Sequence, residues 1–287
     1  MAQTAAFSEI FRTATRSVSS MDHARIRRDP IEWPNRARVA VTWTVIFELY
    51  SDNSRTAKRT LFGGRRGVWR LLDLLDFHQV KASFLVGGYA AERFPEAAVE
   101  IKRRGHEIAA YGYASNRLLS KMSRDQEKKE ILTALDMLEK ITGDRPVGWV
   151  SPDLLPGEHT LEILAEAGIL WNGDFPNDDL PYVVQAAGKP LVIIPYTKES
   201  DDQEIYQQGG QPTSVWRDCF IDGLDILIEE GATHPKMLNA SIHAHVLGHS
   251  LGVKPIDHVI RYAKSRPGVW FTTRTEIAKW WLERQYS

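Results

Sequence analysis

The chain of 287 residues is 43% hydrophobic and 25% charged, with 36 basic and 37 acidic side chains. This balance excludes a general nucleic-acid or membrane-surface partner, because both need a basic excess. The single cysteine, Cys219, excludes an internal disulfide framework and indicates a reducing, cytoplasmic environment. No apolar run approaches the roughly 18 residues of a membrane-spanning helix.

Residues 1–30 are expected to form an N-terminal arm. Within residues 5–20, Arg12 and Arg16 are balanced by one acid, Glu9, a composition faintly like that of a transit peptide. The segment lacks an apolar core and a small-residue cleavage pattern, so a secretory signal is excluded. We expect the arm to pack on the domain or on a neighbouring subunit, and residues 31–287 to form one domain.

The elements predicted after this arm alternate between strands and helices. Residues 38–47 form a nearly continuous apolar, β-branched run, typical of a strand buried on both faces of a parallel sheet. Ser123, with Gln126 three residues later, matches a capping box, so a long helix begins there and ends at Gly143. The other expected elements, in chain order, are helix 68–75, strand 82–86, helix 90–104, strand 105–111, strand 148–151, helix 160–167, strand 169–171, strand 191–194, helix 215–230, strand 237–242, helix 256–265, strand 269–271 and helix 275–284. This alternation predicts an α/β fold with a mostly parallel sheet.

Four short segments carry the most specific information. They are Gly148-Trp149-Val150-Ser151-Pro152, Asn177-Asp178-Asp179-Leu180-Pro181-Tyr182, Ile194-Pro195-Tyr196 and Ser241-Ile242-His243-Ala244-His245. In this order they resemble the polysaccharide deacetylase (NodB-homology) superfamily, and within it the allantoinase-like branch, which opens small cyclic amides. The resemblance extends from Trp33 to Ala278 and implies a distorted (β/α)7 barrel.

The resemblance also implies which positions of this chain correspond to the metal ligands of the superfamily. In its metal-dependent members, one Asp and two His bind the ion. Those positions fall at Ile46, at Tyr111 and at Ser115 or Asn116. Isoleucine cannot bind a metal, and tyrosine is a rare ligand for zinc-like ions. An arginine that the superfamily uses in catalysis is replaced by Val150. We therefore expect a site without a metal or another cofactor.

The residues that the resemblance retains mark the expected catalytic centre. They are Glu48, Trp149, Asp178, Asp179, Tyr196, Asp202 and His243. Catalytic groups of parallel barrels lie at the carboxyl ends of the strands. Glu48 directly follows the first predicted strand and His243 ends a late one, so we predict that they share one pocket and that one of them activates water. Asp179 is predicted as a third catalytic residue, which orients the substrate or stabilises the oxyanion.

Five side chains are predicted to bind substrate: Tyr111, Trp149, Asp178, Tyr196 and His245. Trp149 would stack on a planar ring, with a place in the core as the alternative. Asp178 and Asp179 would tune each other's pKa, or instead cap backbone amides of their own loop. Tyr111 would donate a hydrogen bond where the metal otherwise lies, or simply fill that space.

A second arrangement of histidines offers an alternative to the metal-free site. His243 and His245 alternate along a predicted strand, so their side chains share one face. With His249 they form an H-x-H-x₃-H spacing that is able to hold a divalent metal.

The leading functional hypothesis is a hydrolase of a C–N bond in a small amide, such as a cyclic ureide, imide or hydantoin-like ring. One alternative is a barrel repurposed for another acid–base reaction on a small heterocycle, such as ring opening, elimination or isomerisation. A metabolite-binding pseudoenzyme is the non-enzymatic alternative. The expected partner is a small-molecule substrate, and the resemblance implies a homo-oligomer.

Overall fold

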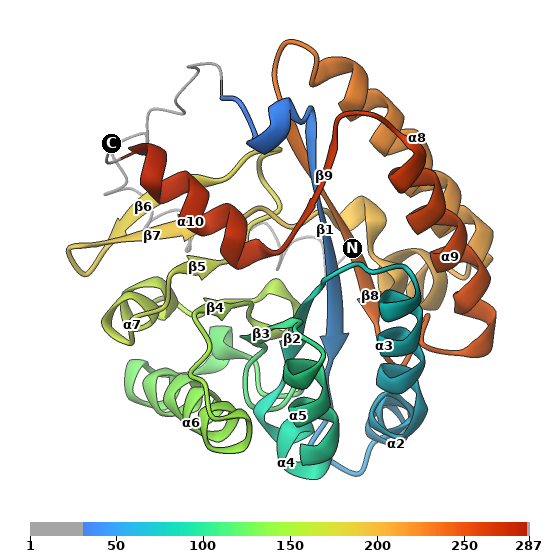
Figure 1. Ribbon diagram of the computed structural model, residues 1–287. Coiled ribbons are helices and arrows are strands. Elements are labelled where there is room, and N and C mark those ends of the chain that lie inside the picture. The colour runs from blue at the N-terminus through green and yellow to red at the C-terminus, as the bar shows by residue number, and fades with distance from the viewer. Residues whose placement is uncertain (1–30, 286–287) are drawn as a thin grey trace, which may run out of the picture.

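The computed structural model describes residues 31–285, and the expected arm at residues 1–30 lies outside this range. Among these residues one curled sheet runs in the order β6-β7-β5-β4-β3-β2-β1-β8, and β9 also pairs with β1 (Figure 1). The strands are β1 (Val39–Phe47), β2 (Ser83–Val86), β3 (Glu107–Ala110), β4 (Gly148–Trp149), β5 (Trp171–Asn172), β6 (Tyr182–Ala186), β7 (Lys189–Ile193), β8 (Lys236–His243) and β9 (Val269–Thr272). This sheet is the distorted barrel that was expected.

Helices cover the outside of the curled sheet, with α6 and α7 at one side and α8 and α9 at the other (Figure 1). They are α2 (Arg55–Phe62), α3 (Val68–Phe77), α4 (Gly88–Arg93), α5 (Pro95–Arg103), α6 (Arg124–Thr142), α7 (Thr160–Glu166), α8 (Thr213–Glu230), α9 (Ser250–Ser265) and α10 (Arg274–Gln285). The predicted capping box at Ser123 and the left-handed Gly143 after α6 are confirmed. No helix in the described part of the chain is long and apolar enough to cross a membrane.

β1 is the longest strand of the sheet. All nine of its residues are buried, as its apolar pattern predicts. It pairs in parallel with β8 along almost its whole length and with β2 at its carboxyl end. Between β7 and β8 the described residues form one isolated bridge, from Asp201 to Ser241, and the backbone N–H of Met237 also donates to the carbonyl of Asp179.

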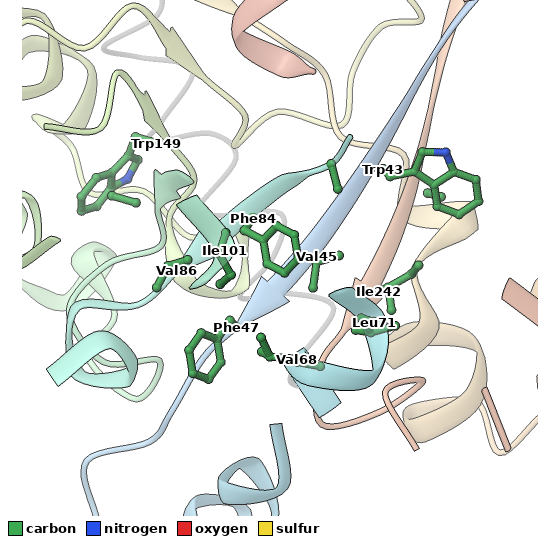
Figure 2. Close-up of a cluster of buried hydrophobic side chains, with 14 of the residues drawn as sticks. Trp43, Val45, Phe47, Val68, Leu71, Phe84, Val86, Ile101, Trp149 and Ile242 are labelled. Atoms are coloured by element: carbon green, nitrogen blue, oxygen red, sulfur yellow. The ribbon is translucent and has the colours of Figure 1, made fainter. Parts of the chain in front are cut away.

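The two faces of β1 belong to two different cores. Val45 and Phe47 pack outward in the large cluster under the helices, and Figure 2 shows them beside Phe84 of β2 and Val68 of α3. Ile46 belongs instead to the cluster inside the barrel, which also contains Ile277 of α10 and other residues near the amino ends of the strands. Because side chains alternate along a strand, the residue that follows β1 on the inner face is Glu48.

Several elements differ from the sequence-based expectations. The helix expected over 90–104 is two helices, because Pro95 begins α5 and the preceding Phe94 leaves the helical conformation. α9 begins at Ser250, six residues before the expected start, and contains Pro255, which has no N–H to donate to the carbonyl of Leu251. The helix α2 and the strand β6 were not expected at all.

The segment after α2 makes an unusually close contact with the loop after β8. A Cβ atom at Gly67 would lie 1.8 Å from the carbonyl oxygen of Ala244. We predict that Gly67→Ala destabilises the fold by about 1–3 kcal/mol, as overpacking of a tight site does. Urea unfolding measures this change. Gly223→Ala is the matched control, because nothing lies within 4 Å of that added methyl; it should leave stability unchanged or raise it, and equal losses in both variants would contradict the prediction.

Candidate active site

The carboxyl ends of β1 and β8 bring the predicted catalytic side chains together. The two strands pair in parallel with Ile46 opposite His243. One step further along the inner face, Glu48 Oε1 lies 3.8 Å from His245 Nδ1. The ring centroids of His243 and His245 are 5.7 Å apart. The predicted proximity of Glu48 and His243 at one edge of the barrel therefore agrees with this geometry.

His243 forms a buried pair with Asp202. Its Nδ1 lies 2.7 Å from Asp202 Oδ1, and the same carboxylate accepts the backbone N–H groups of His243 and Leu247. Burial by itself would lower the pKa of His243, but the carboxylates of Asp201 and Asp202 outweigh it and raise the pKa to about 10. The ring is therefore an imidazolium at neutral pH. Since Nδ1 is held by Asp202, Nε2 is the nitrogen left to give a proton to a substrate.

Glu48 is only 4% exposed. Burial raises the pKa of its carboxyl group, and the positive charge on His243 partly offsets that increase. A carboxylate whose pKa is moved toward neutrality is a better base for a water molecule than an ordinary surface glutamate. Its neighbour His245 stays neutral, because burial, followed by the charge on His243, lowers its pKa to about 3.

Tyr111 provides a hydrogen-bond donor beside these groups. Its phenolic oxygen accepts the backbone N–H of Asp153 at 3.1 Å. Burial raises the pKa of Tyr111 well above its usual value, and the negative charges of Glu48 and Asp153 act in the same direction. The hydroxyl therefore keeps its proton. Among residues 31–285 no acceptor takes this proton, which leaves it available for a developing oxyanion.

Three residues around the site had not been singled out as site residues. Asp201 accepts a 2.6 Å hydrogen bond from Tyr196, so Tyr196 supports the acidic pair instead of presenting its hydroxyl to a substrate. Asp153 follows β4 at the carboxyl edge, which is a position that topology alone could have flagged. Arg274 is fully buried, with its guanidinium carbon 5.7 Å from the centre of the Tyr196 ring; nothing in its sequence context indicates this.

The prediction that Asp179 lies in the catalytic centre is wrong. Asp179 Oδ2 lies 3.2 Å from Lys236 Nζ at the start of β8, whereas His243 ends that strand. Seven residue steps at about 3.3 Å separate the two positions by roughly 23 Å. Asp178 Oδ1 accepts the backbone N–H of Leu180, which confirms the alternative of a loop cap. The loop after β5 runs to the amino edge of the barrel, and a sequence motif does not show the direction of a loop.

Trp149 does not face the site. Its side chain is fully buried in the outer core (Figure 2), and its indole N–H donates to Ser151 Oγ at 3.0 Å. Stacking on a substrate ring is therefore excluded, and the alternative of a core tryptophan is confirmed.

The three histidines proposed as an alternative metal site do not form a group of ligands. Within residues 31–285, the one set of three candidate ligand atoms that come within 4.8 Å of one another belongs to Asp201, Asp202 and His243. The carboxylates of this set already accept hydrogen bonds from protein donors. The ring of His249 instead stacks on Phe62, with centroids 3.5 Å apart.

Several known proteins have the same fold and a similar sequence. The sequence model described as polysaccharide deacetylase matches residues 62–170. A structure from Pseudomonas aeruginosa PAO1, named as a probable polysaccharide deacetylase, is 30% identical with a TM-score of 0.83, over 89% of this chain and 95% of that one. PuuE allantoinase is 28% identical with a TM-score of 0.83, over 91% and 97% of the two chains. A Schizosaccharomyces pombe relative with the polysaccharide deacetylase name is 26% identical over 88% of this chain and 93% of its own.

The chain belongs to the polysaccharide deacetylase (NodB-homology) superfamily. The match to PuuE allantoinase along nearly the whole of both chains places it with the allantoinase-like branch. Membership in this superfamily makes it a hydrolase that acts on carbon–nitrogen bonds other than peptide bonds.

The residues at the usual metal position of this superfamily do not fit a metal ion. Ile46 is 1% exposed and packs among apolar side chains inside the barrel. Tyr111 keeps its proton, and its oxygen is engaged by Asp153. Ser115 offers only a hydroxyl, a weak ligand for a transition metal. This superfamily member therefore lacks the donor set that a zinc-like ion requires at this position.

We predict that this protein, once purified, contains less than about 0.1 equivalent of zinc, cobalt or manganese per chain. A site without thiolate, imidazole and carboxylate ligands binds these ions weakly. Elemental analysis after gel filtration measures the content. About one equivalent per chain that is retained in Asp202→Asn would contradict the prediction, because the ion would then not depend on the group of Asp201, Asp202 and His243.

Proposed function

We propose that this protein opens a small cyclic amide, ureide or imide by metal-independent hydrolysis of a C–N bond. The observation that carries the proposal is the convergence of a buried carboxylate, Glu48, a buried imidazolium, His243, and a protonated phenol, Tyr111, around the position where relatives of this superfamily would hold an ion. Together these supply a base, an acid and an oxyanion donor.

Each group has one role in the proposed reaction. Glu48 takes a proton from water while the water oxygen forms a bond to the carbonyl carbon. The carbonyl electron pair moves onto its oxygen, which the Tyr111 hydroxyl stabilises. When this pair re-forms the carbonyl, the C–N bond breaks and His243 gives its Nε2 proton to the departing nitrogen. Glu48 then loses its proton to solvent and His243 regains one. The product is one opened molecule with a carboxylate at one end and, at the other, the protonated nitrogen as an amine, a urea or an amide according to the ring.

Asp202 is a positioning residue for this reaction. Its carboxylate fixes the orientation of the His243 ring through Nδ1 and keeps the ring protonated. Three hydrogen bonds to protein donors hold the carboxylate itself in place. The acid is thereby preorganised, and no substrate contact is needed to orient it.

A panel of cyclic ureides, imides and hydantoins tests the proposal, with linear N-acetyl sugars as the contrast. We expect turnover of at least one ring class to a product heavier by one water molecule, measured by mass spectrometry. Product without gain of water would support elimination or isomerisation instead. Saturable binding without any product would support a binding protein, and turnover of N-acetyl sugars alone would contradict the proposed substrate class.

A further inference from the structure

Two buried polar atoms beside Glu48 have no hydrogen-bond partner among the described residues. They are Ser115 Oγ and His245 Nδ1, in side chains that are 2% and 6% exposed. An unpartnered buried polar atom costs free energy unless a water molecule or a ligand satisfies it. The two atoms therefore indicate that a polar molecule binds next to the proposed base.

His245 faces the carboxylate of Glu48 across a gap that a direct hydrogen bond does not span. Its Nδ1 lies 3.8 Å from Glu48 Oε1, which exceeds the usual limit of about 3.2 Å for an N–H···O bond. The ring is neutral, because burial, followed by the charge on His243, lowers its pKa to about 3. A water oxygen about 2.8 Å from both atoms would see them at an angle of roughly 85°, near the angle between the two O–H bonds of water. One water molecule is therefore able to donate to both.

Ser115 approaches the same carboxylate from the loop after β3. Its backbone N–H donates to the carbonyl of Leu49 at 3.1 Å, which holds the serine beside the residue that follows Glu48. The hydroxyl lies near enough to Glu48 to oppose the rise in the pKa of that carboxyl group, yet it has no hydrogen-bond partner of normal geometry. Its hydrogen is therefore free for a water molecule beside Glu48.

We propose that Ser115 and His245 hold the attacking water molecule against Glu48. The water donates one hydrogen to Glu48, donates the other to His245 Nδ1 and accepts the hydroxyl hydrogen of Ser115. These contacts leave one lone pair on the water oxygen, and this pair attacks the carbonyl carbon. The inference rests on the proposed function for the reaction, whereas the water site depends only on the contacts around Glu48.

Ser115 and His245 act as positioning residues, because neither exchanges a proton with the substrate. When the oxygen–carbon bond forms, Glu48 takes the first hydrogen of the water as a proton. The hydrogen that His245 accepts stays on the oxygen, which becomes a hydroxyl group of the tetrahedral intermediate. An attacking oxygen that is already oriented by three contacts lowers the entropic part of the barrel's reaction barrier.

Variants of His245 separate this role from a structural one. Asparagine carries a polar atom close to the place of Nδ1, whereas leucine fills a similar space without one. We expect His245→Leu to lower kcat by roughly 10–10²-fold with KM within about twofold, because a misplaced oxygen slows the chemical step and not substrate binding. His245→Asn should keep kcat within about fivefold of the parent. Ser115→Ala should lower kcat by about tenfold, the usual effect of losing one hydrogen bond.

His249→Leu is the matched control, because His249 follows the same strand and its ring stacks on Phe62. It should keep kcat within about twofold of the parent, and urea unfolding shows whether each variant is folded. Equal losses in His245→Leu and His249→Leu, or a His245→Asn protein as slow as His245→Leu, would overturn the positioning role.

A high-resolution crystal structure of the substrate-free protein tests the water site without turnover. We expect one ordered water molecule within about 3.2 Å of the Glu48 carboxylate, Ser115 Oγ and His245 Nδ1. This water should be lost when Ser115→Ala and His245→Leu are combined. A parent structure in which no water contacts both side chains would overturn the inference. If the water is present and the wild type hydrolyses none of the rings, the proposed function fails and the water site stands.

Discussion

Replacing Glu48 with glutamine is expected to lower kcat/KM by roughly 10²–10⁴-fold, the usual cost of removing a general base. Glutamine keeps the size of the side chain but cannot accept a proton from water. Because burial disfavours the charged carboxylate, the neutral amide should leave the free energy of unfolding unchanged or raise it. Steady-state kinetics and urea unfolding of the same preparation measure both quantities.

Asp179→Asn is the control for this change of acid to amide. Asp179 is paired with Lys236 at the opposite end of β8, so its variant should keep activity within about twofold. A Glu48→Gln protein with full turnover would show that Glu48 is not the base. A loss in Asp179→Asn as large as that in Glu48→Gln would show that the reaction occurs at the amino edge of the barrel.

Replacing His243 with alanine is expected to cost a similar factor, roughly 10²–10⁴-fold in kcat/KM, through loss of the acid that protonates the departing nitrogen. In the parent protein, activity should rise with pH as Glu48 loses its proton and fall as His243 loses its own near pH 10. The alkaline decline should be absent from His243→Ala. Initial rates over pH 5–11 record both limbs.

Asp202→Asn separates a true acid role from a structural one. Asp202 raises the pKa of His243, so its removal should move the alkaline decline to lower pH while some activity remains. A purely structural role for the pair would lower the rate at every pH and leave the position of the decline unchanged. That outcome would contradict the assignment of His243 as the acid.

Much of the fold follows from the sequence because apolar periodicity is a local signal. The buried run of β1 and the caps of α6 are confirmed on that basis. The β6–β7 hairpin was not predicted from the sequence. Its turn has Ala187 and Gly188 at positive φ, and alanine is not a residue that indicates such a turn. α2 was not predicted because its sequence, RTAKRTLF, is short and mostly polar, although its few apolar residues gather on one face.

The candidate site was predictable only where topology fixes a side chain. Glu48 and His243 lie where the sequence predicts them. Strand alternation determines which face of the sheet each side chain is on, and the carboxyl ends of parallel strands lie at the same edge of the barrel. Asp179 and Trp149 lie in segments whose direction depends on long-range packing, and their motif positions did not reveal it. Arg274 reaches the barrel interior from the start of α10, a contact between residues far apart in the chain that local patterns do not encode.

The claim that Glu48 and His243 catalyse hydrolysis without a metal is decided by turnover of the best cyclic substrate after exhaustive chelation, with metal content determined on the assayed sample. We predict that the metal-free protein keeps its full kcat/KM, that added zinc or manganese does not increase it, and that Glu48→Gln lowers it by roughly 10²–10⁴-fold. Activity that disappears on chelation and returns with a stoichiometric metal ion would contradict that mechanism.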